Sequence, residues 1–175
     1  LNLSCPNGLD DQGNLHAPVC SNPDISAAVM RMARYEVGSE VCLGAKDSPH
    51  ASSLETGVNM KELELVMQAI RPFVSYIAGV NTIAAQPFPE ITCAGGKGGM
   101  SGPVVAEIAK QHLRLCREFL PDVAYISLGG VDTGNAATEV PERLALGAIR
   151  VGGVQEFYRS AQPHILAARW AMEIV

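Results

Sequence analysis

Cys5 is the residue of this sequence best placed for covalent or acid–base chemistry. It stands between Ser4 and Pro6, directly after the short apolar run 1–4. A cysteine reacts as its thiolate from a partly exposed position, and the loop at the end of a strand provides that exposure. A single cysteine is nevertheless more often a packing residue than a reactive one. Cys5 alone is therefore a candidate and needs support from other residues.

Lys46 is the second candidate, because it closes the apolar run 41–45. A lysine in this position either reaches solvent or holds its charge inside a site. We favour a site, since the other lysines (Lys61, Lys97 and Lys110) lie in helical or loop contexts. A fixed ammonium group can stabilise negative charge that develops on a cofactor.

Three asparagines, Asn2, Asn7 and Asn81, lie at the ends of apolar runs, and Thr82 follows the last of them. Each could be an ordinary turn residue. Together their amides would offer donors and acceptors that match a ring with alternating C=O and N–H groups.

Two glycine pairs, Gly129-Gly130 and Gly152-Gly153, follow later apolar runs. One pair alone is best explained as a tight turn. Two pairs at equivalent ends of consecutive strands favour a phosphate cradle, because glycine lets backbone N–H groups approach an anion closely. The glycine-rich stretch 95–102 is not a Walker loop, since neither Ser nor Thr follows Lys97.

The other titratable residues show no spacing typical of a metal site. The five cysteines are odd in number and contain no C-x-x-C pair, which argues against zinc or disulfides and fits a reducing compartment. His112 falls on an apolar helical stripe and is expected to be packed there. No role is assigned to any histidine, and Asp47 and Asp132 are not paired with another carboxylate.

The composition is that of one globular domain. The chain has 175 residues, 47% of them hydrophobic and 18% charged, with a net charge of −5. The 13 basic residues are scattered, so the charge pattern predicts binding to neither nucleic acid nor a membrane surface.

Short apolar runs alternate with helical patterns along the chain and would position these candidates. The alternation predicts a parallel sheet with right-handed crossovers, which is an α/β fold. It is compatible with the last five units of an eight-stranded barrel or with an open doubly wound sheet. Strands are predicted at 1–4, 41–45, 76–80, 123–128 and 148–151, and helices at 24–35, 59–70, 103–119, 133–146 and 163–174.

Taken together, the motifs resemble the dihydroorotate dehydrogenase family in order and spacing over nearly the whole chain. The most specific are Asn-Leu-Ser-Cys-Pro-Asn at 2–7 and Gly-Gly-Met-Ser-Gly-Pro at 98–103; Lys46, Asn81-Thr82, the glycine pairs and Gly-Ala at 147–148 accompany them. The resemblance implies a (β/α)8 TIM-type barrel that binds FMN. Residues 1–175 would form a single domain, comprising the five C-terminal β/α units, and the N-terminal strands are expected to lie upstream.

The resemblance also implies roles for individual residues. Cys5 matches the base that removes the C5 proton of dihydroorotate while C6 delivers hydride to the flavin. Lys46 matches a lysine beside the flavin ring and is both catalytic and cofactor-binding. The substrate-binding positions are Asn2, Asn7, Asn81 and Thr82, and the cofactor-binding glycines are Gly99, Gly129, Gly130, Gly152 and Gly153.

The partners implied by the resemblance are dihydroorotate and orotate of pyrimidine biosynthesis. The enzyme would be a cytoplasmic homodimer, with an iron–sulfur flavoprotein subunit where NAD is the electron acceptor; fumarate is the other acceptor considered. A cysteine base is similar to the soluble class 1 enzymes, whereas the quinone-linked class carries serine there.

Two alternative functions are kept. Dihydropyrimidine dehydrogenase shares the fold and the cysteine and is similar at 19–24, but it carries His where this chain has Asn7. A non-catalytic protein derived from the barrel is the other alternative. The chain departs from the family in a short loop between Thr82 and Gly98, in Arg150, and in Gly153 where Thr or Ser is usual. A partial barrel would expose strand edges, so residues 1–175 in isolation are not expected to hold FMN stably.

Overall fold

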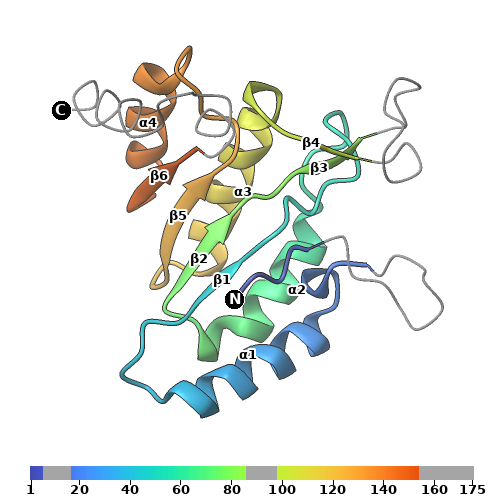
Figure 1. Cartoon of the computed structure of the whole chain (residues 1–175), viewed down its shortest axis with the longest axis vertical. Helices are drawn as coiled ribbons and strands as arrows, with labels where there is room; N and C mark the ends of the chain where they lie inside the picture. The colour runs from blue at the N-terminus through green and yellow to red at the C-terminus, as the bar shows by residue number, and fades with distance from the viewer. Residues whose placement is uncertain (6–16, 86–97, 154–175) are drawn as a thin grey trace, which may run out of the picture.

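The computed structural model describes residues 1–5, 17–85 and 98–153. Its main sheet has four parallel strands in the order β1-β2-β5-β6 (Figure 1). These strands are β1 (Gly44–Lys46), β2 (Tyr76–Gly79), β5 (Ala124–Leu128) and β6 (Arg150–Gly152), and the helices are α1 (Pro23–Val37), α2 (Met60–Ile70), α3 (Ala106–Phe119) and α4 (Ala136–Ala145). The short 3₁₀ turns are η1 (Val19–Ser21), η2 (Arg71–Phe73) and η4 (Pro103–Val105).

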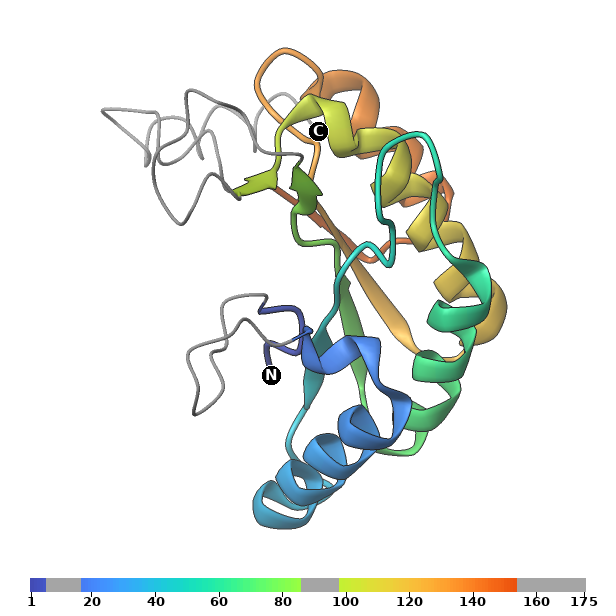
Figure 2. The ribbon, with the colours of Figure 1, turned by 90° about the vertical axis from the view of Figure 1, so that its right-hand side faces the viewer.

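The order of the strands identifies the sheet as an arc of a barrel. Neighbouring strands follow one another in the sequence without a reversal, and the register pairs Lys46 with Ala78 and Ile126 with Arg150. Figure 2 shows all four helices on one side of the sheet. A doubly wound sheet reverses its strand order and carries helices on both faces. The chain is therefore part of a β/α barrel, and the open-sheet alternative is wrong.

Residues 1–5 occupy the position of a further strand beside β1. The Leu3 N–H donates to the Lys46 carbonyl (3.0 Å), and the Lys46 N–H donates to the Leu1 carbonyl (2.7 Å). Only an isolated bridge, between Asn2 and Lys46, is formed. The predicted strand 1–4 is thus reduced to a single parallel bridge at the edge of the described sheet.

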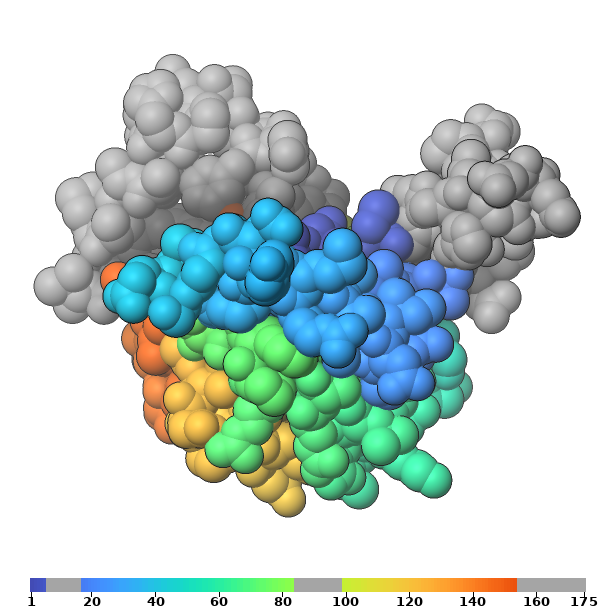
Figure 3. Space-filling model, turned by 90° about the horizontal axis from the view of Figure 1, so that it is seen from below, coloured from blue at the N-terminus to red at the C-terminus, as the bar shows by residue number. Residues whose placement is uncertain are grey.

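The helices begin and end at the residues that their capping chemistry selects. The Asn22 side chain accepts hydrogen bonds from the N–H groups of Asp24 (3.0 Å) and Ile25 (3.1 Å), and α1 stops at Gly38 with φ 76°. Asn59 caps α2 in the same way through Glu62 N–H (3.3 Å). Arg34 near the end of α1 donates to the Phe73 carbonyl (3.0 Å), which joins α1 to η2. Figure 3 views the molecule from the end where the strands begin and shows α1 packed against the segment that follows α2.

Two predicted helices start later than their patterns indicated. The prediction 103–119 divides into η4 and α3, because the chain enters through Gly102 at φ 89° and Pro103. The prediction 133–146 becomes α4 from Ala136, because Asp132 and Asn135 first close a turn through mutual side-chain bonds (2.9 and 3.1 Å). The predicted helix 163–174 lies outside the described residues.

The hydrophobic core lies between the sheet and the helices. On α2 the buried residues are Leu63, Val66, Met67 and Ile70, at the spacing of one helical face. In β5 the side chains alternate, so that Tyr125 and Ser127 are buried and their neighbours only half-buried. Each fully buried large apolar side chain stabilises the fold by about 1.5–3 kcal/mol.

A small antiparallel hairpin projects from the sheet and was not predicted. It consists of β3 (Ile83–Ala85) and β4 (Gly98–Met100), with Ala84 opposite Gly99. Strands of three residues are too short to show an alternating pattern, so no strand was predicted here. Among the described helices, none has the length and apolar character needed to cross a membrane.

Candidate active site

Lys46 lies at the edge of the sheet where the parallel strands end. Its Nζ donates to Oγ of Ser4 (2.9 Å), and the Ser4 hydroxyl donates to Oδ1 of Asn2 (2.8 Å). Burial lowers the pKa of Lys46, and the charges of Cys20, Asp47 and Cys5 partly offset this effect. The half-buried ammonium group is thus held in one place by the segment that contains the candidate cysteine.

Asn81 joins the same cluster from the next strand. It follows β2, and its Nδ2 donates to the backbone carbonyl of Ser4 (3.0 Å). Three of the predicted site residues, Asn2, Lys46 and Asn81, therefore converge on Ser4. Cys5 is exposed beside them. Asn2, Lys46 and Asn81 therefore lie together at one edge of the sheet.

Ser4 is the residue of this cluster that the sequence analysis missed. It is 1% exposed and makes contacts with each of the other three. Its place inside the motif 2–7 was the available signal, but a serine that flanks a cysteine was considered only as its neighbour. Asn7, also predicted to bind substrate, lies outside the described residues.

Thr82 and Gly99 lie against each other on the hairpin. A Cβ placed on Gly99 would collide with Oγ1 of Thr82, so glycine is needed for this approach of β4 to β3. Thr82 is half-buried and Gly99 is exposed. Thr82 directly follows Asn81 and precedes β3, and Gly99 lies in β4, so both residues are at the hairpin and not in the barrel arc.

The pair Gly129-Gly130 forms a tight loop after β5. Both residues have positive φ values, 82° and 79°, and a Cβ on Gly130 would overlap the backbone of Ala106 at the start of α3. The Gly129 carbonyl accepts from Arg143 (2.8 Å) and the Gly130 carbonyl from Asn135 (2.8 Å). In a trans peptide the N–H points opposite to the C=O. The N–H groups of Gly130 and Val131 therefore face away from the Arg143 and Asn135 side chains.

Arg143 supports this loop from α4 and was not predicted to take part. Its side chain is fully buried, and its guanidinium group also donates to Ser127 Oγ (3.1 Å) and to Glu139 Oε2 (3.0 and 2.9 Å). Lys110 of α3 donates to the other oxygen of Glu139 (3.1 Å). Gly152 lies against Leu128 at the end of β6, and Gly153, which follows it, is half-buried.

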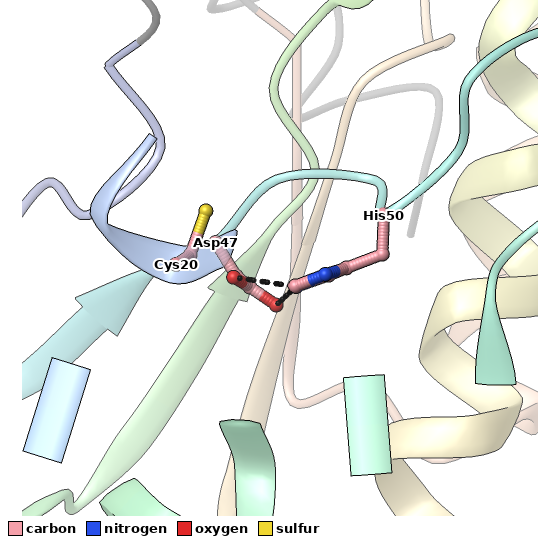
Figure 4. Close-up of side chains that lie close together, drawn as sticks. All are labelled: Cys20, Asp47 and His50. Atoms are coloured by element: carbon pink, nitrogen blue, oxygen red, sulfur yellow. Dashed lines mark hydrogen bonds and ion pairs between the residues drawn. The ribbon is translucent and has the colours of Figure 1, made fainter. Parts of the chain in front are cut away.

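A second, buried polar network begins at Asp47, the residue that follows Lys46. The buried carboxylate of Asp47 faces Nε2 of His50 (3.1 Å) and Nε2 of His112 (3.0 Å). Nδ1 of His50 contacts Glu62 (2.9 Å), and Nδ1 of His112 contacts the Tyr125 hydroxyl (2.6 Å). Figure 4 shows Asp47 and His50 in contact beside Cys20.

The charges of this network follow from its contacts. Burial raises the pKa of Asp47, but the hydrogen bonds from His112 and His50 outweigh it and hold the pKa well below its ordinary value. Burial lowers the pKa of His50, and its bonds to Asp47 and Glu62 reverse this effect and raise it. Burial raises the pKa of the Cys20 thiol to about 11, with a further contribution from Asp47.

His112 lies in the core as predicted, whereas no role was predicted for His50, a buried loop residue. Asp47 and His112 are 65 positions apart, so no short spacing could reveal their contact. The pair Asp47 and His50, three positions apart after a strand, was a local signal that could have been used.

Comparison with known proteins agrees with the fold. The family model of dihydroorotate dehydrogenase matches residues 1–160. The catalytic subunit of dihydroorotate dehydrogenase B (NAD(+)) from Streptococcus pneumoniae serotype 4 is 31% identical over 144 residues, which are 80% of this chain and 42% of that protein. The dihydroorotate dehydrogenase (quinone) of Clavibacter sepedonicus is 46% identical over 65 residues, 37% of this chain and 18% of that protein.

A solved structure shows the same fold at low identity. The dihydroorotate dehydrogenase of Eimeria tenella in complex with ferulenol superposes with a TM-score of 0.71 at 18% identity, covering 99% of this chain and 48% of that one. The chain thus spans less than half the length of the relatives that it matches. A match over residues 1–160 is nonetheless most of the sequence, and the chain belongs to the dihydroorotate dehydrogenase family.

Proposed function

We propose that this chain supplies the FMN- and substrate-binding part of a dihydroorotate dehydrogenase, an oxidoreductase that acts on the CH–CH group of dihydroorotate and forms orotate. The observation that carries the proposal is the convergence of Asn2, Lys46 and Asn81 on Ser4, beside the exposed Cys5. Cationic, amide and thiol groups are thereby gathered at the end of the barrel where β/α enzymes hold their active sites.

The described residues fit FMN. The Gly130 backbone lies so close to Ala106 that a side chain would be excluded, and the N–H groups after the pinned carbonyls of Gly129 and Gly130 suit a phosphate group. Lys46 suits negative charge on the isoalloxazine ring. Gly99, Gly152 and Gly153 complete the proposed cofactor contacts. When bound, FMN would accept the hydride that substrate oxidation releases.

The asparagines offer complementary groups to the substrate ring. Oδ1 of Asn2 already accepts from Ser4, which leaves its Nδ2 to donate to a ring carbonyl. Nδ2 of Asn81 already donates to Ser4, which leaves its Oδ1 to accept from a ring N–H. Asn7 and Thr82 would add further contacts. Cys5 would take the C5 proton of dihydroorotate.

The partners are part of the same proposal. The pneumococcal relative is named a catalytic subunit, which favours a second, iron–sulfur flavoprotein subunit and NAD as the final acceptor. We propose a cytoplasmic homodimer of the catalytic chain within that assembly. Sedimentation of the purified protein, alone and with the candidate subunit, tests both contacts.

The decisive experiment follows flavin bleaching without oxygen in the purified full-length protein. Dihydroorotate should reduce the flavin, and Cys5→Ser should slow this reduction by about 10²–10⁴-fold at neutral pH. The loss should shrink at higher pH, because a serine hydroxyl is a weaker acid than a thiol. Cys42→Ser, at an exposed cysteine before β1, is the control and should reduce at the normal rate.

Two outcomes would contradict the proposal. Reduction by dihydrouracil but not by dihydroorotate would transfer the chain to the dihydropyrimidine dehydrogenases. A full-length protein that retains no flavin would support the non-catalytic alternative. An unchanged rate in Cys5→Ser would remove only the assignment of the base.

A further inference from the structure

A cluster of three different ligand types lies behind the active site. One atom each of Cys20, Asp47 and His50 lies within 4.8 Å of the other two. The cysteine comes from η1, and the other two residues come from the loop after β1 (Figure 4). The three residues are only 0%, 1% and 6% exposed. Cys20 and Asp47 are remote in sequence, which is why ligand spacing predicted no metal site.

Two of the three ligands, His50 and Asp47, are each held by a further group. Glu62 Oε1 lies 2.9 Å from Nδ1 of His50, so Nδ1 is the nitrogen that donates outward and Nε2 is the one that faces Asp47. His112 Nε2 lies 3.0 Å from Oδ2 of Asp47, and Nδ1 of the same ring contacts the Tyr125 hydroxyl. Metal-binding histidines and carboxylates are oriented by partners of this kind.

We propose that Cys20, Asp47 and His50 bind one zinc ion. Nitrogen and sulfur donors favour zinc over magnesium or calcium. Nε2 of His50 and the oxygens of Asp47 are 3.1 Å apart, close to the roughly 3.3 Å expected for two ligands about 2.0–2.1 Å from a tetrahedral zinc ion. A water molecule completes the tetrahedron.

The charges of such a site balance. On binding, the Cys20 thiol and Nε2 of His50 give their protons to solvent, and the thiolate sulfur and the imidazole nitrogen form bonds to zinc, with no change of oxidation state. The thiolate and the Asp47 carboxylate together neutralise the dication, which a buried site requires. The ion would connect η1 to the loop that immediately follows Lys46, and so hold the C-terminal end of β1 in place. This role is structural and does not depend on flavin or substrate.

Metal titration of the purified full-length protein, stripped with a chelator, tests the site directly. Zinc retained after gel filtration is counted by elemental mass spectrometry, and cobalt is used as the coloured probe in a difference spectrum against the metal-free protein. We expect one equivalent of either ion and a thiolate-to-cobalt charge-transfer band. Cys20→Ser should abolish that band, whereas Cys42→Ser should retain it.

Glu62→Gln keeps the test decisive if Cys20→Ser fails to fold. The Glu62 side chain is 35% exposed, so this change is mild for the fold, yet it weakens the support of His50. Zinc affinity should fall by about 10–100-fold. No bound metal, or binding equal to wild type in both Cys20→Ser and Glu62→Gln, would overturn the proposal. Flavin content is irrelevant to this readout, so its failure is separable from failure of the proposed enzyme activity.

Discussion

Substitution of Arg143 is the sharpest test of what stabilises the loop at Gly129-Gly130. Arg143→Met keeps an unbranched apolar stem and removes the charged guanidinium group. The change deletes four hydrogen bonds, two to Glu139 and one each to Ser127 Oγ and the Gly129 carbonyl. Leaving a buried acceptor unpaired costs about 1–3 kcal/mol, and removing one partner of a buried ion pair costs about 3–5 kcal/mol.

The expected loss in the free energy of unfolding is about 3 kcal/mol, the lower end of that range. Glu139 keeps Lys110 as a partner at 3.1 Å, so its carboxylate is not left alone. The freed Gly129 carbonyl should also let the loop move. Losing about 1.4 kcal/mol of binding energy there would weaken FMN affinity by about tenfold.

Urea unfolding of the purified full-length protein measures the first effect, and fluorescence titration with FMN measures the second. Arg71→Met is the matched control, because Arg71 pairs with Asp122 at 2.9 Å but the two side chains are 51% and 59% exposed. Its loss should stay below about 1 kcal/mol. If Arg143→Met unfolds at the wild-type urea concentration and binds FMN normally, Arg143 does not support the loop.

Three further predictions concern the same regions. Gly130→Ala and Gly38→Ala both place alanine at positive φ, at a cost of about 1–3 kcal/mol, but only at Gly130 is there no room for a Cβ. Urea unfolding should therefore show a further loss of about 1–3 kcal/mol for Gly130→Ala, and equal losses would refute the close approach. Ser4→Ala should lower kcat/KM by about 10²-fold in steady-state turnover, because it frees Lys46 and Asn2, which contact the Ser4 hydroxyl; an unchanged value would show that these two contacts are incidental. Lys110 holds the pKa of Glu142 below its ordinary 4.5, so this pair stabilises the fold above that pH and stops doing so as the pH falls. The stability deficit of Lys110→Met should accordingly shrink in acid, and a deficit independent of pH would contradict this sign.

Local sequence patterns determined the elements and the residues at their ends. The helical stripe of α2 placed that helix to within a residue, since the hydrophobic period is a short-range property. The positions of Lys46 and Asn81 after apolar runs were sufficient to predict that they share one edge of a parallel sheet. The motif at 2–7 added the family, and with it the barrel.

Tertiary structure alone decided which of these residues are in contact and which buried polar groups support them. The contact of Asp47 with His112 depends on the rotation of α3 against the sheet, and the burial of Arg143 depends on where α4 meets β5. Both are set by packing between remote segments and leave no local pattern. The convergence on Ser4 likewise required the register of residues 1–5 against β1. Local periodicity thus determined what the chain forms, and packing decided which polar groups become a site.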